Sequence, residues 1–349
     1  MKTLTRRMVA LIALSACASF AAAQDFPTKP VKIVVPYAPG GTTDVLARFI
    51  GQRLSENLGQ SVVVDNRPGA AEAVGAGMVA KSPADGYTLL LSTLTTQAIN
   101  PTLFPKLSFD ATKELTAVGR VADVPGMIAL HPAVPAKNLG EFLAYLKANP
   151  NRNYASPGQG TPNHLATELF KKAAGVQAVH IPYKGGAPAV QDLMAGQVDF
   201  MLILAPEAMP LIASDKLRAL AVTSPQRSPM FPDMPTASEA GVKDFEMVVW
   251  YTLLAPAGTP PDVIAKLNKS LNFVLNEKQT KDKLASLSIK PAGGTPEEAN
   301  AYAAKEAAKW KKVIDDANIR AEQGTWASGF QRSHHAVRHQ MLAWWLAAP

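Results

Sequence analysis

Three glycine-rich segments carry the residues best suited to hold an anion. They read PYAPGGTTD at 36–44, YASPGQGTP at 154–162 and PYKGGAP at 182–188. Each follows a short β-branched or apolar run and precedes a helical pattern, so each is expected to join a strand to a helix. Glycine lets a ligand approach the backbone, and the first N–H groups of the next helix lack partners within that helix. Because the helix dipole adds partial positive charge there, the three loops together predict a site for an anionic group.

Other kinds of chemistry find weaker support. The first loop has neither the Gly-Lys-Ser/Thr of a nucleotide phosphate loop nor the G-x-G-x-x-G pattern. His164 and Glu168 stand four residues apart but lack a third metal ligand, and Lys184 beside two glycines reads first as a solvated charge. Asp44 and Arg48 read as a local ion pair. We therefore expect no metal, cofactor or catalytic role.

An exported enzyme remains an open alternative. It would use Ser156 as a nucleophile together with His164. Ser156 has no G-x-S-x-G context, and no aspartate can be assigned to pair with a histidine beside it. Loss of turnover on Ser156→Ala would favour this alternative over binding.

The elements that must position the loops alternate between strands and helices, which predicts an α/β protein with mainly parallel sheets. The expected strands are 31–35, 62–64, 88–91, 127–130, 178–181, 198–204, 217–222 and 247–254. The expected helices are 43–58, 139–148, 162–174, 188–195, 261–276 and 296–316. In such sheets ligands bind at the carboxyl ends of the strands, where the three loops lie.

The length of 349 residues indicates two domains. Extended apolar segments bounded by Pro or Gly, at 121–125 and 246–256, are the expected crossings between them. Two crossings would build one domain from both ends of the chain and insert the other in the middle.

The N-terminal segment 1–23 reads as a secretory signal peptide, because Lys2, Arg6 and Arg7 precede a short apolar run and an A-x-A site. The only cysteine, Cys17, lies within it in a string that also resembles a lipobox, so a lipid anchor at Cys17 stays an alternative to simple cleavage. Either way, the mature chain would hold no thiol beyond the anchor, and disulfides and cysteine metal sites are excluded.

The net charge of +7 arises from 35 basic and 28 acidic side chains. Removal of the three basic residues in 1–23 lowers it to +4, and the two arginines of the tail 324–349 account for a further two charges. The remaining +2 makes a nucleic-acid partner unexpected.

Several strings occur in a fixed order between about residue 25 and residue 322. They are KPVKIVVPYAPGGTTDVLAR, VVVDNRPGA, ADGYTLLL, LTAVGRVA, NYASPGQGTPNHLA, VHIPYKGGAPAVQDLMAGQVDFM, KLRALAVT, LLAPAGTPPDVIAKLN and GGTPEEANAY. In this order they resemble the Bug-type extracytoplasmic solute receptors, the binding proteins of tripartite tricarboxylate transporters.

The resemblance implies a type II periplasmic-binding-protein fold, with a ligand cleft between two α/β domains. Domain 1 would comprise 24–122 plus 250–322, and domain 2 would comprise 123–249. The protein would be a periplasmic monomer that captures a small organic carboxylate (a di- or tricarboxylate or an aromatic acid) for membrane permease subunits. Delivery to a sensor protein instead of a permease remains open.

The resemblance also implies the ligand contacts. In the first domain they would be Tyr37, Gly40, Gly41, Thr42, Asp44, Ser92, Thr93 and Thr96. In the second domain they would be Ser156, Gly160, Thr161, His164, Tyr183, Lys184 and Gly185.

The chain departs from the family pattern at three places. After GQVDFM the family often carries an aspartate, whereas this chain reads LILAP at 202–206, so an acceptor for a ligand ammonium is expected to be missing and an amino-acid ligand is disfavoured. Glu72 replaces a usual glycine and is expected to be solvated at a helix start, with a position in the cleft as the alternative. The tail 324–349, rich in Trp and His, is expected to be an appended extension without a packed partner; a membrane-touching or metal-binding role is the alternative.

Overall fold

The computed structural model describes residues 26–104 and 106–316. The expected signal peptide, Cys17 and the tail 324–349 lie outside the described residues. Within these residues no helix is both long enough and apolar enough to cross a bilayer.

The strands form one mixed sheet in the order β2-β1-β3-β9-β4-β7-β5-β6, and β8 and β10 also pair with β4. The strands are β1 Val31–Val35, β2 Val62–Asn66, β3 Thr88–Thr93, β4 Leu115–Leu130, β5 Asn153–Ser156, β6 Val179–Pro182, β7 Phe200–Leu204, β8 Arg218–Val222, β9 Val248–Pro256 and β10 Lys290–Gly293. The helices are α2 Thr42–Leu58, α3 Ala73–Ala80, the π-helical η2 Thr95–Ile99, α4 Asn100–Leu103, α5 Ala111–Glu114, α6 Leu139–Ala148, α7 Pro162–Ala174, α8 Gly186–Met194, α9 Ala205–Ala213, α10 Pro261–Asn276, α11 Lys278–Ala285 and α12 Pro296–Asp316.

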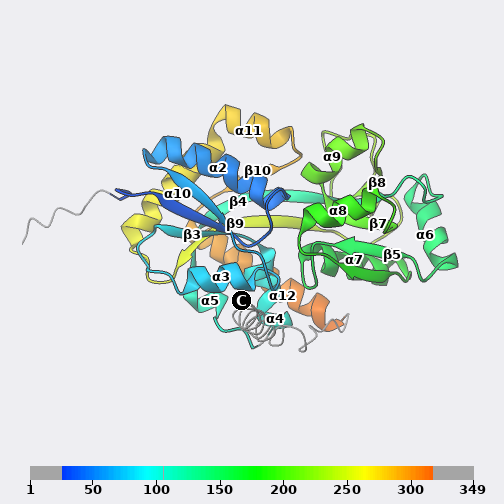
Figure 1. The fold of residues 1–349 in the computed structure, drawn as a ribbon, viewed down its shortest axis with the longest axis horizontal. Coiled ribbons are helices and arrows are strands. Elements are labelled where there is room, and N and C mark those ends of the chain that lie inside the picture. The colour runs from blue at the N-terminus through cyan, green and yellow to red at the C-terminus, as the bar shows by residue number, and fades with distance from the viewer. Residues whose placement is uncertain (1–25, 105, 317–349) are drawn as a thin grey trace, which may run out of the picture.

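The molecule has two lobes connected by long strands (Figure 1). The first lobe contains β1–β3, β10, α2–α5 and α10–α12, and the second contains β5–β8 and α6–α9. Strands β4 and β9 pair with each other along most of their length and extend from one lobe toward the other. The two expected crossings, 121–125 and 246–256, fall on these two strands.

The prediction of an α/β fold is confirmed, but the prediction of mainly parallel sheets is wrong. Pairing is parallel in the outer parts, where β1 lies between β2 and β3 and where β5 lies between β6 and β7. Every pairing of β4 and β9 is antiparallel. The reason is that the chain passes between the lobes in extended strands, whereas parallel neighbours require a crossover connection.

Local signals set several element ends correctly. Strand 31–35 and helices 139–148, 162–174, 261–276 and 296–316 have the expected bounds. Helix α7, for example, begins with a proline at its first position and ends at Gly175 in a left-handed conformation (φ 62°). Helix α8 begins at Gly186, two residues before the expected start.

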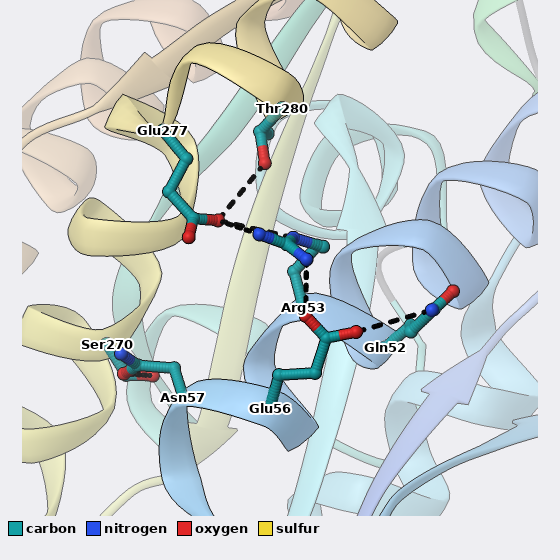
Figure 2. A network of polar contacts seen from close by, with 7 residues as sticks. All are labelled: Gln52, Arg53, Glu56, Asn57, Ser270, Glu277 and Thr280. Carbon is teal, nitrogen blue, oxygen red and sulfur yellow. Dashed lines mark hydrogen bonds and ion pairs between the residues drawn. The ribbon is translucent and has the colours of Figure 1, made fainter.

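The C-terminal half of helix α2 makes polar contacts with α10 and with the residue that precedes α11 (Figure 2). Arg53 forms an ion pair of 2.7 Å with Glu277, which precedes α11, and also contacts Glu56 on its own helix. The Ser270 hydroxyl on α10 donates to Asn57 at 2.7 Å. These contacts hold the helix whose other end, the N-terminus, faces the second lobe.

Candidate ligand-binding site

The three glycine-rich loops meet at one cavity of about 400 Å³ between the lobes. The first lobe contributes the loop after β1 and residues 68–72, and the second contributes residues 157–159, Thr161 and 182–185. A larger hollow of about 970 Å³ lies on the first lobe beside α5, α10 and α12, but none of the glycine-rich loops reaches it. The interlobe cavity is therefore the candidate site, and its size suits a small organic molecule.

A smaller recess of about 30 Å³ adjoins this cavity and shares Tyr37, Ala38 and Pro157 with it. We call the two spaces the outer cavity and the inner recess. The recess has room for about one water molecule or one functional group. Its polar lining comes from both lobes: Thr42, Thr43, Thr93, Asn163, Glu207 and Tyr251.

The expected ligand contacts fall into two groups. Those that line the outer cavity or the inner recess are Tyr37, Gly41, Thr42, Thr93, Thr161, Tyr183, Lys184 and Gly185. Those that do not line these two spaces are Gly40, Asp44, Ser92, Thr96, Ser156, Gly160 and His164. The residues of the second group make hydrogen bonds inside the protein.

Asp44 fixes the loop after β1. Its carboxylate accepts from the Gly40 N–H at 3.1 Å and from the Asn66 amide at 2.9 Å, and it forms the expected ion pair with Arg48 at 2.9 Å. Burial alone would raise its pKa, but the hydrogen bonds from Arg48, Asn66 and Gly40 lower it overall. Asp44 is thus an ionised group engaged within the first lobe.

Two stacked histidines hold the loops of the second lobe. The rings of His164 and His180 lie 4.0 Å apart, and Tyr154 stacks on His180 at 4.9 Å. His164 Nδ1 accepts from the Gly160 N–H at 3.1 Å, and His180 Nε2 lies 2.6 Å from the Ser156 hydroxyl. Burial lowers the pKa of His164 to about 4 and, with the neighbouring His164, that of His180 to about 3, so both rings are neutral at neutral pH.

The structure does not form the Ser156–His164 pair that the enzyme alternative requires. Ser156 is fully buried and shares its hydrogen bond with His180, and no bond joins it to His164.

Glu72 is buried, so the expectation that it is solvated is wrong. Its side chain is 1% exposed and forms part of the wall of the outer cavity. The carboxylate accepts from the Ser92 hydroxyl at 2.8 Å, from the Thr93 N–H at 3.1 Å and from the Thr96 hydroxyl at 2.6 Å, and it also contacts the Thr93 hydroxyl. Burial raises its pKa although the hydroxyls act in the opposite direction.

The backbone at Glu72 is unusual. Ala70, Ala71 and Glu72 have φ angles of 50°, 46° and 70°, three successive left-handed residues without a glycine. Each such residue costs about 1 kcal/mol or more, because only glycine adopts this region readily. The side-chain hydrogen bonds of Glu72 offset part of that strain.

Glu207 was missed by the sequence reasoning. It lies in the first turn of α9 and accepts from the Thr42 N–H at 2.8 Å and from the Thr42 hydroxyl at 2.7 Å. A carboxylate of the second lobe thus accepts hydrogen bonds at the N-terminus of α2, which belongs to the first lobe. The residue is partly exposed, yet the carboxylate lies deep enough that burial raises its pKa. The sequence signal that could have revealed it is its position, because Glu207 directly follows the segment 202–206. The expectation that this strand end offers no acceptor for a ligand ammonium is therefore wrong.

Two lobes joined by paired strands, with polar loops converging on a cavity between them, define a solute-binding protein. Residues 46–319 match the sequence profile of the tripartite tricarboxylate transporter family receptors. The chain belongs to this family, and the resemblance stated from its motifs is confirmed.

Individual relatives match this chain over nearly their whole length. Protein BugT of Bordetella pertussis is 37% identical over 305 residues, which is 87% of this chain and 94% of BugT. The R. palustris protein Rpa4515, solved with adipate, superimposes with a TM-score of 0.83 at 37% identity and covers 85% of this chain and 99% of its own. The MatC protein of Rhodopseudomonas palustris, solved with malate, gives 0.79 at 32% identity over 83% and 100% of the two chains.

Proposed function

We propose that this protein is a periplasmic receptor that captures a small organic carboxylate and delivers it to the membrane subunits of a tripartite transporter. The observation that carries the proposal is the convergence of the three glycine-rich loops on one interlobe cavity. Lys184 adds a positive charge to its rim, and the N-termini of α7 and α8 add partial positive charge. The adipate and malate bound by two relatives fit this class of ligand.

Capture would proceed by closure of two domains, 24–122 plus 250–322 and 123–249, with β4 and β9 as the hinge. A ligand that touches loops of both domains stabilises the closed form, because only that form offers all of its contacts. Export would remove 1–23, and the mature protein would work as a monomer without a cofactor or a catalytic step.

A thermal-shift screen tests the proposal directly. We expect adipate, malate, citrate or benzoate to raise the melting temperature, whereas glucose and maltose leave it unchanged. A ligand present at 100 times its Kd stabilises the native state by about 2.7 kcal/mol, which such a screen detects. Stabilisation by a sugar and by none of the acids would refute the proposal.

Gly185 is the position where a single methyl group should weaken capture. Its φ of 132° lies in a region that only glycine enters readily, and an added Cβ would stand 3.2 Å from the Cβ of Ala38 on the opposite lobe. We expect Gly185→Ala to weaken binding of the best acid of the screen about tenfold, measured by calorimetry, because the contact with Ala38 arises only when the lobes close and such overpacking costs about 1–3 kcal/mol.

Gly175→Ala is the matched control, since Gly175 is also left-handed (φ 62°) but meets nothing within 4 Å and ends α7 away from the cavity. It should lower the melting temperature without changing affinity. Equal affinities for the two variants would show that Gly185 has no special part in the site.

A further inference from the structure

Glu207 already occupies the place where a ligand carboxylate would meet the N-terminus of α2. Its Oε1 accepts both the N–H and the hydroxyl of Thr42. A second carboxylate brought to this helix end would meet a like charge at close range in a poorly solvated recess, which is unfavourable. The inner recess therefore disfavours an anionic group.

A second acidic group strengthens this effect. The buried carboxylate of Glu72 lies on the first-lobe side of the cavity and accepts its hydrogen bonds from residues 92–96. Besides burial, the charges of Glu207 and Glu72 both raise the pKa of Tyr251, which places all three groups within electrostatic reach. Glu207 in the recess and Glu72 on the adjoining wall of the outer cavity thus bring two carboxylates to the side of the site near Tyr251.

The recess also contains polar atoms that lack a hydrogen-bond partner among the described residues. Glu207 Oε2 accepts no hydrogen bond from the described residues, and it lies beside Gly186, where an added Cβ would be 3.0 Å away. The Tyr251 hydroxyl is fully buried and has no hydrogen-bond partner of good geometry in the described part of the chain, although Thr43 is close enough to affect its pKa. Both residues line the recess. A buried hydroxyl without a partner is costly, so a ligand group that pairs with it gains affinity.

The opposite end of the site carries the positive charge. Lys184 and Thr161 line the outer cavity beside the loops that begin α7 and α8, and they do not line the recess. A ligand of modest length can therefore place one end beside Lys184 in the outer cavity and the other end beside Glu207 in the inner recess.

We propose that Glu207 makes this receptor selective for a carboxylate whose other end carries a hydrogen-bond donor, an ammonium or a hydroxyl. The donor enters the inner recess and bonds Glu207 Oε2 and the Tyr251 hydroxyl, and the carboxylate faces Lys184 in the outer cavity. This inference rests on the proposed function and narrows its ligand class from carboxylates in general to amino and hydroxy acids. It reverses the expectation, drawn from residues 202–206, that an amino-acid ligand is disfavoured.

Two series of acids matched in chain length test this selectivity by calorimetry at neutral pH. The longer series is ε-aminocaproate, ε-hydroxycaproate and adipate, and the shorter is γ-aminobutyrate, γ-hydroxybutyrate and succinate. In at least one series the wild-type protein should bind a donor-terminated acid about tenfold more tightly than the dicarboxylate. Glu207→Gln should abolish that preference, because its amide removes the charge and keeps an acceptor for Thr42.

Glu298→Gln provides the matched control. Glu298 accepts from the Thr295 N–H at 2.8 Å at the start of α12, the same kind of helix-end bond remote from the cavity, so the preference should stay unchanged. Tyr251→Phe supplies a second variant that leaves both carboxylates in place, and it should weaken donor-terminated acids severalfold more than dicarboxylates.

The outcomes separate the two proposals. If the dicarboxylate binds as tightly as its donor-terminated partners in both series, or if Glu207→Gln leaves the preference intact, the selectivity inference is overturned and carboxylate capture stands. If none of these six acids and none of the acids of the thermal-shift screen binds, the proposed function falls together with it.

Discussion

Replacing Glu72 by alanine is expected to lower the free energy of unfolding by about 3 kcal/mol. The change leaves the Thr93 N–H and the Thr96 hydroxyl without their acceptor in a buried place, whereas the Ser92 hydroxyl keeps the Thr93 carbonyl. Each buried donor left unpaired costs about 1–3 kcal/mol, while removal of a buried charge offsets part of the sum. Urea denaturation at neutral pH measures the loss.

Glu72→Gly separates the contribution of the lost hydrogen bonds from that of the backbone strain at this position. Glycine tolerates the φ of 70°, so this variant should be about 1 kcal/mol more stable than Glu72→Ala while losing the same hydrogen bonds. Glu297→Ala, an exposed glutamate in the first turn of α12, should cost less than about 1 kcal/mol. A loss for Glu72→Ala no larger than that of Glu297→Ala would mean that the hydroxyl cluster does not depend on the carboxylate.

Glu72 and Glu207 also show where sequence reasoning stops. The glycine-rich loops and the helix starts were predictable because their signals are local: a strand pattern, a turn residue and a helix pattern follow one another along the chain. The burial of Glu72 depends on hydroxyls 20 to 24 positions away, and the bond from Thr42 to Glu207 spans 165 positions. No spacing rule relates residues so distant until the lobes are assembled.

The same limit explains why the antiparallel strand pairing and the contacts of the polar residues in the second lobe were not predicted. Strand-helix alternation predicted the parallel pairings around β1 and β5 but held no information on the antiparallel pairing of β4 with β9, which joins residues far apart in the chain. Ser156 and His164 were predicted as ligand contacts, but neither lines the outer cavity or the inner recess. Their contacts involve His180 on the neighbouring strand β6, which the sequence did not associate with them.

The stacked histidines should make the protein sensitive to mild acid. Unfolded histidine takes up a proton near pH 6.5, whereas burial keeps the pKa of folded His164 at about 4 and that of His180 at about 3. As the pH falls below about 6.5, the unfolded state therefore binds more protons than the native state, and stability declines until the folded pKa values are passed. Between about pH 7 and pH 5 the pair should cost about 4 kcal/mol of unfolding free energy, measured by urea denaturation at each pH.

His180→Phe isolates this contribution, because it keeps a ring between Tyr154 and His164 but cannot take up a proton. Its unfolding free energy should fall about half as steeply over the same pH interval as that of the wild-type protein. Glu72 and Glu207 cannot mimic the effect, because their raised pKa values give the opposite sign: protonation on acidification favours their buried forms. A carboxylate with a lowered pKa, such as Asp44, does lose stability in acid, but chiefly near and below the ordinary carboxyl pKa of about 4. An unchanged slope in His180→Phe, or imidazole NMR shifts that titrate near pH 6.5 in the folded protein, would contradict the buried neutral pair. A flatter slope would place the acid sensitivity in the two rings that contact the Ser156 hydroxyl and the Gly160 N–H.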